Sequence, residues 1–216
     1  MKSINWPDQI LNFIGVIFGV LLAFYIAELD NTRQERKELR IIVESFIEDL
    51  KDDQDTYRVQ IPDNEVHAMG IERLMTGIQE EQPDSIAKYL DYLYSADNYS
   101  PTSTTYISVV SSGKLDLIEN LSLKKKLSNY YDNLATEAEF RGKFQIDYLF
   151  EHIIPWVVAN IDTAGDPVGQ IMGQYQLSNH LQWYQGLILN KVNMYQDISV
   201  SANALTGDLK HFLEEI

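Results

Sequence analysis

The hydrophobic pattern of the chain changes sharply near its beginning. From Ile10 to Ala27 the sequence carries no charged residue, and Asn12 is the only strongly polar side chain. A run of about 18 apolar residues is close to the shortest helix that crosses a bilayer. The pattern predicts a transmembrane helix over residues 10–27.

Two aromatic residues flank this apolar run. Trp6 and Tyr25 lie roughly 28 Å apart along a helix, so both rings would lie at headgroup level. Residues 1–9 are then an interfacial segment. A buried core helix and a cleaved signal peptide are the alternatives, but Tyr25 before Ala27 fits a signal-peptidase site badly.

Small residues recur at every fourth position of the predicted membrane helix: Gly15, Gly19, Ala23 and Ala27. On a helix they form one smooth stripe, which lets a second helix approach closely in a bilayer. The alternative is chance, because glycine and alanine are common in membrane helices. The spacing predicts a helix-packing interface at these four residues.

The predicted membrane helix has no proline or glycine where it leaves the bilayer, so it is expected to continue as a stalk over residues 28–60. The charged run from Arg33 to Arg40 is interpreted as a solvated face with local ion pairs and no ligand. Beyond it, apolar residues follow the three-and-four spacing of an amphipathic helix. They are Leu39, Ile42, Val43, Phe46, Ile47 and Leu50.

Prolines are expected to divide the remaining chain, residues 61–216, into the helices of a bundle. Pro62 is expected to end the stalk helix, with Asp63 or Asn64 capping the next helix. Further along, a long helix from residue 121 to residue 153 is expected to stop at Pro155.

The last forty residues have the most regular pattern. Apolar positions alternate in steps of three and four, and only Lys191 interrupts them. The seam consists of Leu181, Tyr184, Ile188, Lys191, Tyr195, Ile198, Ala202, Leu205, Leu209, Phe212 and Ile216. Such a helix packs along a neighbour, either inside the domain or across an oligomer interface. With no strand pattern of any length, the sequence predicts an all-α fold: a single N-terminal transmembrane helix continuing into a stalk and an antiparallel helical bundle.

The amino-acid composition of the chain disfavours some classes of binding partner. The formal net charge is −15, from 32 acidic and 17 basic side chains, which disfavours nucleic acid and anionic lipid surfaces. The chain has no cysteine, which excludes disulfides, thiolate metal sites and cysteine nucleophiles. The expected partners are the lipid bilayer and either a second copy or another membrane protein, with no nucleic acid.

No sequence motif indicates a catalytic, cofactor-binding or metal-binding site. The four histidines, at positions 67, 152, 180 and 211, include no pair three or four residues apart, as helical metal sites usually need. Nucleotide-binding, hydrolase and calcium-binding motifs are missing from the sequence. We therefore expect no catalytic, cofactor-binding or metal-binding residue, and no enzyme. The many tyrosines between Tyr89 and Tyr106 either line a pocket or, more simply, fill a core.

Two segments carry a family resemblance, "IGVIFGVLLAFYIAELDNTRQERKELRIIVESFIEDLKDD" and "YISVVSSGKLDLIENLSLKKKLSNYY". Together they resemble a family of uncharacterised bacterial single-pass membrane proteins, defined by a domain of unknown function. The shared pattern falls on Ser112, Gly113, Leu115, Ile118 and Asn120, with Lys114 as a departure from it. The resemblance implies the architecture and a bacterial plasma membrane, and it carries no catalytic signature.

The physical interpretation of this motif is a structural corner. Gly113 is expected to end one helix in a left-handed conformation, and Leu115 and Ile118 to anchor the turn in the core. Asn120 or Ser122 is expected to cap the next helix. A small ligand held at the turn is the alternative.

These features favour a non-enzymatic, membrane-anchored assembly or accessory module that self-associates or docks on a larger membrane complex. The alternative is a membrane-tethered sensor, in which the bundle binds a small ligand and passes a signal through the stalk to a partner. A polar cavity near the tyrosines would favour the sensor, and a filled core would favour the assembly module.

The basic residues on either side of the predicted span indicate on which side of the membrane the bundle lies. Lys2 precedes the span, whereas Arg33, Arg36, Lys37 and Arg40 follow it, and basic residues favour the cytoplasmic side. The acidic, tyrosine-rich composition would also suit a periplasmic face. The expectation is a single-pass protein of the bacterial inner membrane with its bundle in the cytoplasm.

Overall fold

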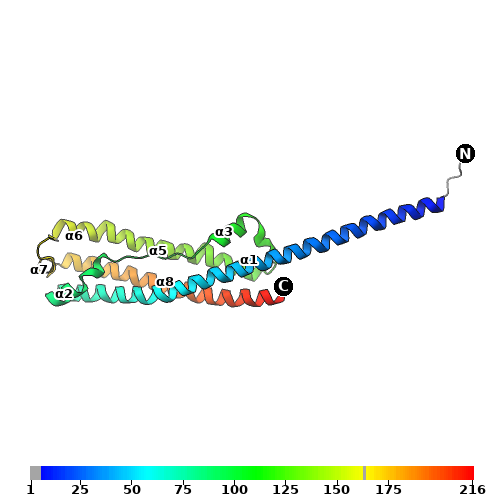
Figure 1. Cartoon of the computed structure of the whole chain (residues 1–216). Coiled ribbons are helices and arrows are strands. Elements are labelled where there is room, and N and C mark those ends of the chain that lie inside the picture. The colour runs from blue at the N-terminus through cyan, green and yellow to red at the C-terminus, as the bar shows by residue number, and fades with distance from the viewer. Residues whose placement is uncertain (1–5, 163) are drawn as a thin grey trace.

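Three long helical stretches lie side by side in the computed structural model, which describes residues 6–162 and 164–216 (Figure 1). They are α1 (Trp6–Gln79), the helical run from Leu121 to Asn160, and α8 (Tyr175–Glu215). No strand occurs among the described residues, so the all-α prediction is confirmed.

The helix α1 is continuous over 74 residues and contains Pro62. The predicted break at Pro62, with Asp63 or Asn64 capping a new helix, is therefore wrong. Pro62 lies on the exposed side of α1, where the carbonyl group left without its helical partner faces water. Tyr57 and Ile71, which lie on either side of the proline in the sequence, are fully buried, and their packing keeps both halves in line.

The helix α8 runs antiparallel to α1. Gln54 pairs with Thr206 at 2.9 Å, whereas further along α1 the Ala68 carbonyl accepts a hydrogen bond from Gln185 at 3.3 Å. Residue numbers thus fall on one helix as they rise on the other. The predicted seam forms the buried face of α8, through Leu181, Tyr184, Ile188, Lys191, Tyr195, Ile198, Ala202, Leu205 and Leu209.

The third stretch does not stop at Pro155, as the sequence suggested, but continues to Asn160. Just before the proline the backbone makes a π turn, in which the Ile154 N–H bonds to the Leu149 carbonyl five residues back. That wider turn accommodates a residue that has no N–H to donate. The stretch consists of α4 (Leu121–Ser128), η3 (Asn129–Leu134), α5 (Ala135–Tyr148), η4 (Leu149–Ile153) and α6 (Ile154–Asn160).

Short elements connect the long ones. After α1 come α2 (Pro83–Tyr89) and η1 (Leu90–Tyr94), and then an irregular segment, residues 95–103, which we call the strap. It leads into α3 (Thr104–Ser111) and η2 (Lys114–Leu117). The connection between the third stretch and α8 contains a short helix, α7 (Pro167–Ile171).

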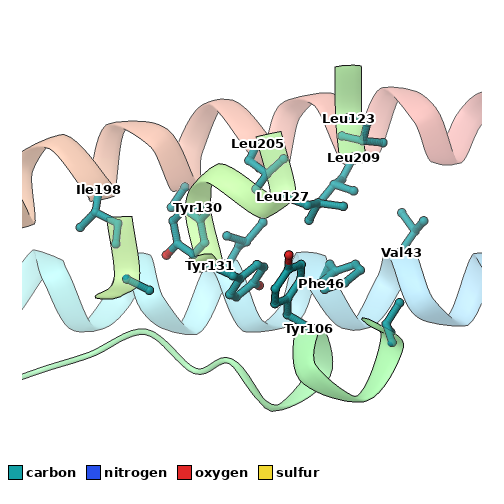
Figure 2. Close-up of a cluster of buried hydrophobic side chains, with 14 of the residues drawn as sticks. Val43, Phe46, Tyr106, Leu123, Leu127, Tyr130, Tyr131, Ile198, Leu205 and Leu209 are labelled. Atoms are coloured by element: carbon teal, nitrogen blue, oxygen red, sulfur yellow. The ribbon is translucent and has the colours of Figure 1, made fainter. Parts of the chain in front are cut away.

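The bundle begins earlier on α1 than the sequence suggested. Leu39 is the first buried residue of α1, and Val43, Phe46 and Leu50 are fully buried in the core nearest the apolar end (Figure 2). Most of the predicted stalk, residues 28–60, therefore belongs to the bundle that this helix was expected to enter. Three-and-four spacing does not distinguish a free amphipathic stalk from a helix that contributes a bundle core.

Candidate functional site

The first part of α1 projects from the bundle with no neighbour in the described chain (Figure 1). Every residue from Phe13 to Lys37 is exposed, and Phe18 and Phe24 are each 70% exposed. The most apolar window of α1 has a mean hydropathy of 2.0, with none of it buried. By length and composition, α1 is able to cross a membrane. Burial of this segment is left to something outside the chain, which excludes the alternative of a buried core helix.

The predicted packing stripe lies within this projecting segment. Because α1 is helical there, Gly15, Gly19, Ala23 and Ala27 fall on one face. A Cβ atom added to Gly15 or Gly19 would meet no atom within 4 Å. The stripe therefore contacts no other part of the described chain.

The stripe and the bundle lie on opposite sides of α1. Counted at about 100° per residue, the stripe is about half a turn away from the face that carries Leu39, Val43 and Phe46. A helix packed on the stripe would consequently pass along the side of α1 that α8 leaves free. The bundle poses no obstacle to such a partner.

The predicted corner lies at the end of the bundle nearest the apolar segment. Gly113 has a φ of 72°, which is the left-handed region that glycine adopts without strain. Ile118 is fully buried, Leu115 packs on the same core, and Ser112 donates to the Val109 carbonyl at 3.2 Å. Asn120 caps α4 by accepting a hydrogen bond from the Leu123 N–H at 3.1 Å.

The corner is also tied to α1, because Lys114 forms an ion pair with Glu38. This contact joins the corner to the point where α1 enters the bundle. The geometry is that of a helix-to-helix connection.

A buried polar layer holds the strap, and its main acceptor is Asp53 of α1. The Asp53 side chain is fully buried and accepts hydrogen bonds from Tyr99 at 2.6 Å, Tyr130 at 2.7 Å and the Thr102 N–H at 3.2 Å. Burial raises the pKa of Asp53, while the hydrogen bonds from the two tyrosines oppose that shift. Two donors from the strap and one from η3 thus meet at one carboxylate.

The second anchor of the strap is Lys191 of α8. Its ammonium group is fully buried and donates to the Asp97 carbonyl at 2.6 Å and to the Asp97 carboxylate at 2.9 Å. Burial lowers the pKa of Lys191, and the contact with Asp97 opposes the shift. The interruption of the α8 seam is thereby explained, because Lys191 points at the strap.

Two tyrosine hydroxyl groups of α8 also form hydrogen bonds with the strap. Tyr184 donates to the Ser95 carbonyl at 2.9 Å, and Tyr195 accepts from the Tyr99 N–H at 2.8 Å. Burial raises the pKa of each of these α8 tyrosines to about 12, so both stay protonated near neutral pH. The strap is thus bonded at several points along its length.

The tyrosine-rich region is packed rather than hollow. The rings of Tyr57 and Tyr99 meet edge to face at 5.1 Å, and Tyr106 stacks on Tyr131 at 4.7 Å (Figure 2). Beside Tyr92 lies a shallow, open depression of about 220 Å³.

Two histidines that are far apart in the sequence come together. The rings of His152 and His180 stack at 6.3 Å, and the hydroxyl of Tyr148 lies 3.0 Å from Nδ1 of His180. His67 is buried, with Nε2 at 2.9 Å from the Tyr92 carbonyl. Within residues 6–162 and 164–216 no group of three or more acidic, histidine or cysteine side chains is arranged to hold a metal ion.

The fold and the exposed apolar segment define a class: a helical bundle built around one long helix whose free end is apolar enough to cross a membrane. No protein-family model, curated protein or solved structure matches the chain.

Proposed function

We propose that this protein is a membrane-anchored assembly module without enzymatic activity, whose membrane helix packs against a second copy of the chain. One observation carries the proposal: α1 is a single helix that is unpartnered and apolar from Phe13 to Ala27 and forms part of the bundle core from Leu39 onward. An apolar surface of this size on a soluble protein needs a bilayer or another protein to cover it.

The stripe supports a helical partner within the membrane. Between lipid-embedded helices no hydrophobic force acts, and small residues allow the backbone approach that supplies dispersion contacts. The stripe also lies on the side of α1 away from the bundle, so two copies fit together about a twofold axis. A different membrane subunit is the alternative partner.

The buried polar groups support a structural rather than a catalytic role. Asp53 and Lys191 are used to bond the strap, and each has its partners within the chain. A catalytic carboxylate or lysine would instead face a pocket that a substrate enters.

A ligand sensor is the second candidate, because the same rigid helix links the bundle to the membrane. It requires a cavity that a small molecule could fill. The rings of Tyr99 and Tyr106 pack against those of Tyr57 and Tyr131, and a filled core of this kind favours the assembly module.

The proposed location is the inner membrane of a bacterium, with the bundle in the cytoplasm. Arg33, Arg36 and Lys37 directly follow the apolar segment and are exposed, as the positive-inside rule requires of a cytoplasmic flank. A reporter that functions only in the cytoplasm, fused to the C-terminus, is expected to be active. Activity of a reporter that functions only in the periplasm would contradict this side.

Cysteine crosslinking in membranes tests the assembly. The chain has no cysteine, so a single substitution gives an unambiguous signal. We expect Ala23→Cys, on the stripe, to form a disulfide-linked dimer, and Leu21→Cys, about 200° away around the helix, to remain monomeric. Equal crosslinking at both positions would refute the stripe as the contact, and no crosslinking with a copy at either would point to a different subunit.

A further inference from the structure

Three basic side chains follow the apolar segment of α1 on a single helix face. Arg33, Arg36 and Lys37 are separated by three and four residues, which aligns them along the helix. All three are exposed, and none takes part in an ion pair within the described chain, whereas Arg40 pairs with Glu44 at 3.0 Å. Arg33 and Lys37 are therefore free to meet a partner, whereas Arg36 also lines a cleft with Glu35, Asp116, Glu119 and Glu215.

The acidic residues of the same turns mostly point away from this basic face. Glu28 and Glu35 are five and two residues from Arg33, which places them about 140° and 200° around the helix. Asp30 is closer, but its carboxylate already accepts a hydrogen bond from Gln34 at 3.2 Å. Charge is thus segregated on a segment whose total charge is near zero.

The basic face lies at the level of lipid headgroups. Counted from Leu29, Arg33 is about 6 Å and Lys37 about 12 Å along the helix axis. The headgroup layer is about 5–8 Å thick on each side of the hydrocarbon core. Helical side chains lean toward the N-terminus, so these long side chains lean back toward the bilayer.

A hollow on the helix surface begins directly below Arg33. It has a volume of about 560 Å³ and is lined by Ala23, Ile26, Ala27, Leu29, Asp30 and Arg33. The hollow is therefore apolar on the membrane side. Its outer rim carries the Arg33 guanidinium group and the Asp30 carboxylate, which already accepts a hydrogen bond from Gln34. That combination fits an acyl chain joined to an anionic headgroup.

The proposed dimer covers the Ala23 end of this hollow and leaves the end at Leu29 and Arg33 open. Helices that pack through a glycine stripe cross at about 40°, so they separate on either side of the crossing. Ala27 lies about 12 Å along the axis from Gly19. At that distance two helices that cross near Gly19 have moved apart.

We propose that Arg33, Arg36 and Lys37 bind the phosphate groups of anionic phospholipids in the leaflet next to the bundle. The inference rests on the proposed membrane anchoring and adds a lipid class to it. The net charge of −15 does not oppose such binding, because nearly all of it is carried beyond Glu38. Arg33 is about 9 Å along the helix axis from Leu39, where the bundle begins, and this distance is close to the screening length in physiological salt.

Native mass spectrometry of the full chain in detergent tests the proposal. Phosphatidylglycerol and phosphatidylcholine with identical acyl chains serve as probes. We expect the chain to retain phosphatidylglycerol at least about tenfold more, because each basic residue near a headgroup layer attracts anionic lipid. The variant Arg33→Gln/Arg36→Gln/Lys37→Gln is expected to lose that preference.

The matched control removes three other exposed basic residues of α1, as Lys51→Gln/Arg58→Gln/Arg73→Gln, and is expected to keep the preference. Equal retention of both lipids by the unmodified chain would overturn the lipid site. So would an unchanged preference in the triple variant of the basic face.

Reconstitution into vesicles distinguishes a failure of the lipid site from a failure of the proposed membrane anchor. A chain that inserts into phosphatidylcholine vesicles but shows no preference for phosphatidylglycerol refutes the lipid site alone. A chain that fails to insert into such vesicles refutes the membrane anchor and the lipid site together.

Discussion

At the scale of single residues, the strap is held by an ion pair, Lys191 and Asp97, whose two side chains are buried to different extents. Lys191 is fully buried, whereas the Asp97 side chain is 42% exposed. Loss of Asp97 leaves an ammonium group in the core without its counter-ion, but loss of Lys191 leaves a carboxylate that water can reach. A buried charge left without its partner typically costs 3–5 kcal/mol.

This asymmetry gives the first prediction. Asp97→Ala is expected to lower the free energy of unfolding by about 3 kcal/mol, and Lys191→Met by less. Chemical denaturation of the full chain in detergent, followed by circular dichroism, measures both. The Asp97→Ala deficit is expected to shrink at high pH, where Lys191 sheds its proton; equal costs for the two variants would contradict the unequal burial.

A second prediction concerns Asp53, whose pKa burial raises above its ordinary value of 3.8. A carboxyl group with a higher pKa in the folded chain stabilises the fold fully below its unfolded pKa, and this contribution is lost as pH rises through the folded pKa. Asparagine does not titrate. Relative to Asp53→Asn, the native chain is expected to lose stability as pH rises from about 4.

Measurement of both unfolding free energies over a pH series isolates this effect from the other carboxyl groups. A difference between the native chain and Asp53→Asn that is the same at every pH would show that Asp53 does not titrate differently on folding.

The sequence revealed only part of this polar layer. Lys191 stood out because it interrupts an apolar seam, so its presence on a packed face could be predicted. Its partner could not, because Asp97 is 94 residues away in a segment with no periodicity. Asp53 was similarly hidden, since a single carboxylate on an amphipathic helix is usually solvated.

At the scale of elements, periodicity was a better guide than prolines. The seam predicted for the last helix is the buried face of α8, yet neither Pro62 nor Pro155 ends its helix. A proline removes one hydrogen bond and crowds one turn, and this local cost was outweighed at Pro62 by packing on both sides and at Pro155 by a π turn. Tertiary contacts of that kind are not visible in a local motif.

The α8 seam gives the third prediction. Leu205→Asp is expected to lower the free energy of unfolding by about 3 kcal/mol or more, because an ionised carboxylate would enter an apolar core without a partner. Leu205 is 2% exposed and lies opposite the aromatic cluster of α1 and η3 (Figure 2). Thermal unfolding in detergent measures the loss.

Asn203→Asp adds a carboxylate two residues away, on the exposed face of α8, and serves as the control. It is expected to change the midpoint of unfolding little. Similar losses at positions 203 and 205 would mean that the seam does not determine the packing of α8.

The stripe gives the fourth prediction. Gly19→Leu places a branched side chain where a partner backbone would approach, so it is expected to abolish the Ala23→Cys crosslink. Val20→Leu adds bulk about 100° away and is expected to leave the crosslink intact. A crosslink that responds equally to the two changes would show that close packing at Gly19 is not required.

At the scale of the whole molecule, α1 is both a projecting apolar helix and a part of the bundle core. Its apolar end projects away from the bundle, and about ten residues, roughly 15 Å, separate Leu29 from Leu39 (Figure 1). The all-α class and the N-terminal span followed from hydropathy alone. The length of the free stalk could not be predicted in this way. It depends on where the core begins on α1, and the core begins where α8 and the third stretch pack against α1.

The fifth prediction separates the two roles of α1. A chain that begins at residue 30 retains every buried residue of the bundle, since the first of them is Leu39. We expect it to be soluble without detergent, largely helical by circular dichroism and monomeric by light scattering, because the stripe is removed. The full chain in detergent is expected to be dimeric. A truncated chain that still dimerises would show that the copies associate through the bundle surface. A truncated chain that is unfolded, or that remains with the membrane fraction, would refute the division of α1 into an anchor and a core helix.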